Sequence, residues 1–283
     1  MTTDIKGLAD LSAIECQGQK LIVDHHGAKV LGLFFHDNNV LFYDEEDIAH
    51  SGIPLCFPSF GPLKNGEFLH NGKNYPMKQH GFARDFVFDL IERGENFLTF
   101  ELKSSAQTLE RFPFEFTFQV RYTLASNSLK IDFDCKNNST EKLPLAPGVH
   151  PYFSVDDAQK IFFTSKATKG NNNLQNYDAV PAKDILPVSQ ENGVLLYQIT
   201  GTPDLHLIDH GLHETLIKPG KLSPLKMTAD AEVFKRMAIW RNSENAGFIC
   251  IEPANVQNAL NEKAILVESG ESFKTQVSIT AVE

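Results

Sequence analysis

The chain has no excess of positive charge. It holds 26 lysines and arginines against 36 aspartates and glutamates, which gives a formal net charge of −10 at pH 7. Proteins that bind nucleic acid or an anionic membrane surface do so through basic side chains, so neither partner is expected here. A small anionic substrate remains compatible with this charge, because it needs only one or two local cations.

Cysteine is scarce, and the four residues Cys16, Cys56, Cys135 and Cys250 form no closely spaced pair. This spacing excludes a zinc ribbon and a Cys-x-x-Cys redox site, and the apolar neighbours of the cysteines predict four reduced, buried thiols. No window approaches the roughly 18 apolar residues of a membrane-spanning helix. Residues 1–6 also lack the features of a signal peptide, so a cytoplasmic protein is expected.

Tryptophan occurs once, whereas phenylalanine occurs 22 times, and this bias favours aromatic packing between strands. Of the 283 residues, 42% are hydrophobic, which is enough for a sizeable core, and the 22% that are charged do not indicate disorder. The sequence contains no internal repeat, low-complexity tract or linker. Residues 1–283 are therefore expected to form a single domain.

Strict alternation of apolar and polar residues predicts one pair of strands clearly. Apolar side chains occupy every second position over Phe112–Leu124 and again over Leu129–Cys135, with a turn at Asn127. Short apolar runs separated by turn residues fill most of the remaining chain, including a predicted hairpin turn at Asn71–Gly72. Residues 229–240 fit a helix and a strand about equally well. The pattern predicts an all-β fold, either a sandwich or a barrel.

A break in the strand pattern presents a histidine. Pro147 and Gly148 end an extended run, and His150 follows, directly before Pro151 and two aromatic residues. An imidazole held on a stiff turn against aromatic rings suits proton transfer near neutral pH. The alternative is a core histidine satisfied by one hydrogen bond.

A carboxylate ends another apolar run. Glu252 follows the apolar residues 248–251 and precedes Pro253, so its side chain is expected to be partly desolvated and its anion correspondingly basic. The alternative is a glutamate on the rim of a sheet. Residues 52–62 hold three prolines and two glycines among apolar residues, which predicts a buried irregular segment of the kind that lines sites.

A second polar group of residues surrounds Gly81. His80 and Arg84 lie four residues apart, so on an extended backbone they would share one face, and together they offer a donor and a forked cation to a small polar ligand. The alternative for Arg84 is an ion pair with one of three nearby carboxylates, those of Asp85, Asp89 and Glu92.

Three histidines and three carboxylates lie between Asp204 and Glu214, which raises the question of a metal site. Their spacing matches no familiar ligand pattern, so a solvated loop with one useful carboxylate is favoured over a metal centre. The sequence also contains no glycine-rich phosphate loop and no Gly-x-Ser-x-Gly elbow. Neither a metal nor a cofactor is expected.

In combination, four motifs resemble the aldose 1-epimerase (galactose mutarotase-like) superfamily. They are Gly52–Pro58, Gln79–Arg84, His150–Phe153 and Ile251–Pro253, in this order along the chain. Within the superfamily, the chain is most similar to the branch that holds hexose-6-phosphate mutarotases and LacX-like proteins. The resemblance spans roughly residues 14–280.

The resemblance implies a fold and a reaction. The fold is a large antiparallel β-sandwich with the sugar site in a cleft on one sheet. The reaction interconverts the α and β anomers of an aldohexose or a hexose 6-phosphate without a cofactor. Glu252 would act as the general base on the C1 hydroxyl, and His150 would act as the general acid on the ring oxygen. The alternative function is a non-catalytic β-sandwich that binds or senses a carbohydrate.

The same resemblance implies the sugar-binding residues. His80 and Arg84 would contact the sugar, and Asp204 is favoured over Asp209 as the aspartate that holds sugar hydroxyls. His50 stands where the phosphate-binding branch has an arginine, and an imidazole is a weaker phosphate ligand than a guanidinium near pH 7. The expected partner is a small aldose or aldose phosphate, and the protein is expected to be a monomer or a homodimer.

Overall fold

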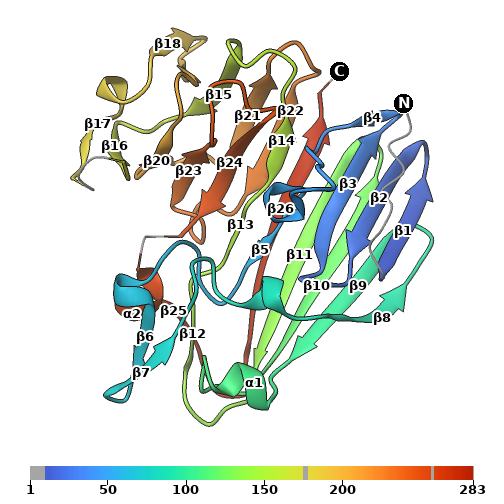
Figure 1. Ribbon diagram of the computed structural model, residues 1–283, viewed down its shortest axis with the longest axis vertical. Coiled ribbons are helices and arrows are strands. Elements are labelled where there is room, and N and C mark those ends of the chain that lie inside the picture. The colour runs from blue at the N-terminus through green and yellow to red at the C-terminus, as the bar shows by residue number, and fades with distance from the viewer. Residues whose placement is uncertain (1–9, 175–177, 256–257, 283) are drawn as a thin grey trace.

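The computed structural model describes residues 10–174, 178–255 and 258–282, and strands dominate it (Figure 1). Residues 1–6, which were inspected above for a signal peptide, lie outside the described residues. Helical structure in the described ranges is limited to short turns: α1 (Ala106–Leu109), α2 (Ala259–Glu262), η1 (Ile48–His50), η2 (Lys64–Gly66), η3 (Ala83–Asp85) and η4 (Ala182–Asp184). Within these ranges, no helix is both long and apolar enough to cross a membrane.

One antiparallel sheet runs through the whole molecule. Its ten strands are, in spatial order, β18 (Val188–Glu191), β19 (Val194–Gln198), β15 (Ile161–Ser165), β21 (Glu214–Pro219), β22 (Leu225–Ala229), β26 (Ser272–Ala281), β11 (Ser128–Asn137), β10 (Phe116–Ala125), β9 (Phe97–Lys103) and β8 (Asp89–Arg93).

Two smaller sheets accompany the large one. The four-stranded sheet contains β1 (Leu11–Cys16), β2 (Gln19–Asp24), β3 (Lys29–Phe35) and β4 (Asn38–Asn39). The six-stranded sheet contains, in spatial order, β14 (Tyr152–Ser154), β24 (Phe248–Ala254), β23 (Arg236–Trp240), β20 (Asp204–Leu207), β16 (Lys169–Asn172) and β17 (Val180–Pro181). Three two-stranded pairs complete the fold: β12 (Leu143–Leu145) with β25 (Ile265–Val267), β13 (Gly148–Val149) with β5 (Leu55–Cys56), and β6 (Glu67–His70) with β7 (Lys73–Pro76).

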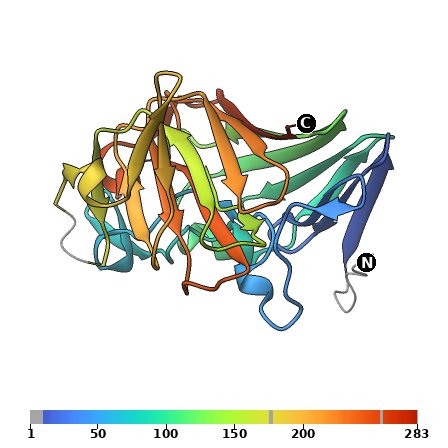
Figure 2. The ribbon, with the colours of Figure 1, turned by 90° about the horizontal axis from the view of Figure 1, so that it is seen from above.

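The three larger sheets share one hydrophobic core. Leu21 of the four-stranded sheet, Phe118 of the ten-stranded sheet and Ile251 of the six-stranded sheet belong to the same buried cluster. Figure 2 shows the large sheet as one curved layer, with β1–β4 beneath one end and β20, β23 and β24 beneath the other. The prediction of an all-β antiparallel sandwich is confirmed, and the alternative of a barrel is excluded because the large sheet is open at β18 and β8.

The predicted strand pair is confirmed, with a correction at its start. β10 and β11 pair antiparallel, and Phe118 lies opposite Cys135. The strand begins at Phe116 rather than at Phe112. The backbone N–H of Phe112 donates to the carbonyl of Thr108 at 2.8 Å, so this residue still belongs to the turn that follows α1. Phe112 is nevertheless fully buried, so its apolar character was correctly linked to the core.

Other local predictions have mixed outcomes. The hairpin turn at Asn71–Gly72 joins β6 to β7, as predicted. The ambiguous residues 229–240 contain β22's last residue and the strand β23, and no helix. The prediction of four buried cysteines is wrong for Cys16, which is partly exposed at the end of an outer strand, whereas the other three are buried free thiols.

Candidate active site

Strand alternation places polar side chains on the face of the six-stranded sheet that points away from the sandwich core. In β24, Ile249 and Ile251 belong to the main core, so Cys250 and Glu252 point to the opposite face. In β20, Leu205 likewise packs into the core. The alternation therefore brings the polar residues of neighbouring strands to one surface.

An irregular segment packs over part of this surface and forms, with it, an open cavity of about 360 Å³. The cover consists of residues from the predicted irregular segment 52–62, joined by η1 and by the loop before η3. The polar or aromatic side chains around the cavity are His50, Cys56, Phe60, Gln79, His80, Arg84, His150, Tyr152, Asn173, Asp204, His206, Trp240 and Glu252. The cavity is large enough for a small molecule and rich in hydrogen-bonding groups.

His150 and Glu252 face each other inside the cavity. The Nε2 atom of His150 lies 3.4 Å from Oε2 of Glu252, and the two side chains are only 12% and 3% exposed. Burial lowers the pKa of His150 to about 3. Burial, and after it the charge of Asp204, raises the pKa of Glu252 well above its usual value. Both shifts have the same cause, because a buried site disfavours either charged form.

His80 is held as a neutral hydrogen-bond donor. The backbone N–H of Gly61 donates to its Nδ1 at 3.2 Å, and the thiol of Cys56 lies 3.3 Å from the same atom. Nδ1 is thus the acceptor, so the ring proton resides on Nε2. Burial lowers the pKa of His80 well below its ordinary value, which keeps the ring uncharged.

Arg84 lines the same cavity, but the backbone geometry expected for it was wrong. His80 has a φ of +66°, and Arg84 lies in the η3 turn, so the segment is a sharp turn rather than an extended strand. The ion pair considered as an alternative is not formed: Asp85 pairs with Lys78 and Arg111 instead. Arg84 donates from Nη2 to the carbonyl of Gln79 at 2.7 Å.

Of the two candidate aspartates, only Asp204 lines the cavity. Its Oδ1 accepts a hydrogen bond from Nδ2 of Asn173 at 2.6 Å, which fixes the orientation of the carboxylate. Asp209 lies outside the cavity, where its carboxylate accepts hydrogen bonds from the backbone N–H groups of Thr168 and Lys169, both at 3.0 Å. The structure therefore assigns a structural role to Asp209 and leaves Asp204 as the candidate for ligand binding.

His50 stands at the rim of the cavity. Its side chain is 43% exposed, and Nδ1 lies 2.7 Å from the carboxylate of Asp47. The ring stacks on Trp240 with a centroid separation of 5.5 Å. The ring also meets Tyr152 edge-on at 6.0 Å, so one acid and two aromatic rings hold His50 in place.

Asn173, His206 and Trp240 are among the cavity residues that were not assigned to a site from the sequence. His206 is 6% exposed, and its Nδ1 atom has no hydrogen-bond partner. The signal for His206 was available, because Asp204 and His206 lie two residues apart in a strand-like run and therefore share a face. No comparable signal existed for Asn173, which sits in a loop.

The residues between Asp204 and Glu214 do not converge on one point. His206 faces the cavity, whereas His210 lies in the interior between the hydroxyls of Ser165 and Thr215, at 2.8 and 2.9 Å. In the described ranges, the histidine, cysteine and carboxylate atoms close enough to share a metal ion belong to His150, Cys250 and Glu252. His150 and Glu252 line the cavity described above, whereas Cys250 lies in a buried cluster with Tyr152, Ala246 and Phe248.

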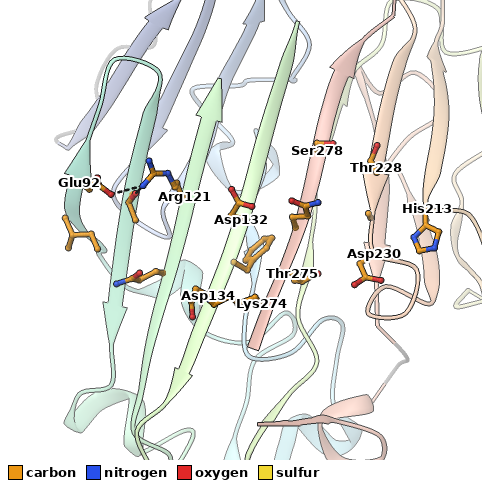
Figure 3. A pocket seen from close by; sticks show the side chains of 16 residues that line it. Glu92, Arg121, Asp132, Asp134, His213, Thr228, Asp230, Lys274, Thr275 and Ser278 are labelled. Atoms are coloured by element: carbon orange, nitrogen blue, oxygen red, sulfur yellow. Dashed lines mark hydrogen bonds and ion pairs between the residues drawn. The ribbon is translucent and has the colours of Figure 1, made fainter. Parts of the chain in front are cut away.

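A larger hollow of about 760 Å³ lies on the outer face of the ten-stranded sheet (Figure 3). Both of its cations are paired: Arg121 lies 2.7 Å from Glu92, and Lys274 lies 3.0 Å from Asp134. The smaller cavity is the better candidate for chemistry, because it alone of the two holds buried groups with strongly shifted pKa values.

Comparisons with known proteins agree with the geometry. The family model described as aldose 1-epimerase matches residues 25–280. The chain is 25% identical to protein LacX of Lactococcus lactis subsp. lactis over 78% of this chain and 79% of that protein. It is 22% identical, over 88% of this chain and 75% of the relative, to a protein of Cenchrus ciliaris named provisionally a glucose-6-phosphate 1-epimerase.

The fold has a solved counterpart as well. The crystal structure of a galactose mutarotase-like protein from Lactobacillus casei superimposes with a TM-score of 0.81 at 21% identity, covering 96% of this chain and 100% of that one. Together with the family model, which spans most of the chain, these findings show that the protein belongs to the aldose 1-epimerase family, a family of isomerases.

Proposed function

We propose that this protein interconverts the α and β anomers of an aldohexose or its 6-phosphate by general acid–base catalysis. The observation that carries the proposal is the pair His150 and Glu252, whose side chains lie 3.4 Å apart and are buried in one cavity. Anomer exchange needs one group that accepts the proton of the C1 hydroxyl and one that donates a proton to the ring oxygen, with no covalent intermediate.

In the proposed reaction, Glu252 takes the proton of the C1 hydroxyl while His150 protonates the ring oxygen. The ring opens to the aldehyde, the C1–C2 bond rotates, and the ring closes on the other face with the two residues in exchanged roles. The contact between the two side chains permits the proton held by the pair to reside on either of them. Burial strengthens their interaction with the reacting oxygens, because little water competes for them.

The other cavity residues are suited to hold the sugar. His80 offers the Nε2 proton as a fixed donor, and Asp204, oriented by Asn173, offers carboxylate oxygens to hydroxyl groups. His206 presents a neutral imidazole, because burial lowers its pKa to about 4. The arrangement thus combines donors and acceptors around a polar ligand.

Direct measurement of anomer exchange tests the proposal. With freshly dissolved α-glucose, α-galactose and α-glucose 6-phosphate, we expect the protein to accelerate the change in optical rotation, or saturation transfer between the anomeric protons in NMR, for at least one sugar. The rate should survive a chelator, because no step involves a metal. Binding of a sugar without any acceleration would favour the alternative, a non-catalytic carbohydrate-binding protein.

The pH dependence of kcat/KM follows from the buried pair. Exchange requires that the pair holds one shared proton. The pair does so at pH values between the pKa of His150, which is lowered to about 3, and the raised pKa of Glu252. Activity should therefore fall on the acid side only near pH 3, where a second proton blocks the base. It should fall on the alkaline side as pH rises through the pKa of Glu252, where the last proton is lost. A fall of kcat/KM on the acid side at about pH 4.3, the ordinary pKa of a glutamate, would contradict the assignment of the acid-side pKa to His150.

A further inference from the structure

A second cavity, of about 490 Å³, adjoins the sugar cavity. The two cavities share Arg84, Ala49 and Pro54 in their walls. The wall of the second cavity also contains Lys29. Because Arg84 belongs to both walls, the two cavities meet at this residue.

The charges around the second cavity are unevenly compensated. Lys78 is neutralised by Asp85, at 3.0 Å. Lys29 donates from Nζ to the carbonyl of Ile48, and Arg84 donates to a carbonyl as well. Among the described residues, no carboxylate lies within ion-pair distance of either Lys29 or Arg84. The remaining carboxylate of this wall, Asp24, attracts Lys29 only at longer range and accepts a hydrogen bond from the N–H of His26 at 2.9 Å.

The fold holds the two cations close together. Lys29 begins β3, directly after the turn at Gly27, and Gly27 has a φ of +74°. A Cβ atom at Gly27 would lie 3.0 Å from Cα of Arg84, so the turn packs directly against η3. The N–H of Gly27 also donates to the carbonyl of Phe86 at 2.7 Å, which ties the two segments together.

Burial disfavours the charged form of Lys29. It lowers the pKa of Lys29 to about 8, although Asp24 opposes the shift more strongly than Arg84 adds to it. A partly buried ammonium next to a guanidinium is stabilised by a bound anion, which supplies the missing opposite charge. This pair of cations therefore has the properties of an anion-binding site.

We propose that Lys29 and Arg84 bind a phosphate group carried by the aldose in the first cavity, with Lys29 as the residue that selects the phosphorylated sugar. This inference rests on the proposed function. A phosphate monoester carries about −1.5 to −2 charges at pH 7, which matches two cations, whereas a carboxylate is satisfied by the guanidinium fork alone. His50, at the rim, is already paired with Asp47 and is not needed for this role.

Phosphate binding would also change the pKa of His150, the proposed general acid. Arg84 and Lys29 both disfavour the protonated form of His150, in addition to the larger effect of burial on its pKa. A bound dianion offsets these two charges and so raises the pKa of His150 toward its ordinary value. A phosphorylated sugar would thereby favour the protonation state in which His150 donates to the ring oxygen.

The substitution Lys29→Met tests the proposal, with Lys78→Met as the matched control from the same cavity wall. The measured quantity is the ratio of kcat/KM for glucose 6-phosphate to kcat/KM for glucose, from NMR exchange. We expect Lys29→Met to lower this ratio by about 10- to 100-fold, the effect of losing one hydrogen bond between charged groups. Lys78→Met should lower it less than about 3-fold, because an exposed ion pair contributes little. An unchanged ratio in Lys29→Met, or an equal fall in Lys78→Met, would overturn the proposal.

Two further measurements separate the possible failures. Glucuronic acid carries a carboxylate in place of the phosphate. If Lys29→Met lowered kcat/KM for glucuronate more than kcat/KM for glucose 6-phosphate, the assignment to phosphate would be refuted. Calorimetric titration with inorganic phosphate measures the affinity of the anion site independently of catalysis. Lys29→Met should lower this affinity. If the wild-type protein exchanges no sugar but binds phosphate through Lys29, the proposed function fails while the anion site stands.

Discussion

Replacing Glu252 with Gln, or His150 with Asn, should each reduce kcat for anomer exchange by about 10²–10⁴-fold. Both substitutions keep the approximate shape of the side chain but remove its ability to transfer a proton. The two losses should not add in the double variant, because the residues act as one unit on a single proton. Exchange rates from NMR saturation transfer, at saturating sugar, give kcat for all three variants.

Matched controls separate lost chemistry from lost packing. His210→Asn removes another buried histidine, which hydrogen-bonds to Ser165 and Thr215 away from the cavity. Glu101→Gln removes another buried carboxylate, which pairs with Lys103 on the ten-stranded sheet. Both controls should keep kcat within a few-fold of the wild type. A wild-type rate in Glu252→Gln or His150→Asn would refute the proposed mechanism.

The sequence carried most of the information on the fold because the strands alternate so regularly. The period-two pattern of β10 and β11 specified which face is buried, but it left a sandwich and a barrel open, and the family resemblance favoured the sandwich. The start of β10 was predicted too early because Phe112 is apolar but lies in a turn. Residues 229–240 could not be resolved locally, since only pairing of β23 with β20 and β24 selects the strand.

The site was less predictable, because it is assembled from segments far apart in the chain. Period two identifies Glu252 as a residue on the outer face of its strand, but not the cover that encloses it. The joint position of His80 and Arg84 depends on a left-handed backbone at His80, which sequence pattern alone does not indicate for a histidine. Asn173 enters the cavity only through tertiary contact with Asp204.

Substituting Gly52 by Ala should destabilise the protein by about 2–5 kcal/mol, the combined effect of a left-handed non-glycine residue and an overpacked contact. Gly52 has a φ of +71°, and an added Cβ atom would lie 1.9 Å from the carbonyl oxygen of Val30. That oxygen already accepts a hydrogen bond from Ile53 at 2.7 Å, and the carbonyl of Gly52 accepts one from Tyr152 at 2.9 Å. The contact is between backbones, so no side chain can turn aside to relieve it.

Gly72→Ala is the matched control for this substitution. Gly72 has a similar φ of +74° in the β6–β7 turn, but no atom lies within 4 Å of an added Cβ, so only the conformational cost of about 1–2 kcal/mol remains. Urea denaturation of the two variants measures the difference. An equal fall in the free energy of unfolding in both variants would show that the contact with Val30 does not add to the destabilisation by Gly52→Ala. The expected excess in Gly52→Ala would locate the constraint where the irregular segment meets β3, because Val30 follows Lys29 in that strand and Gly52 begins the segment that covers the cavity.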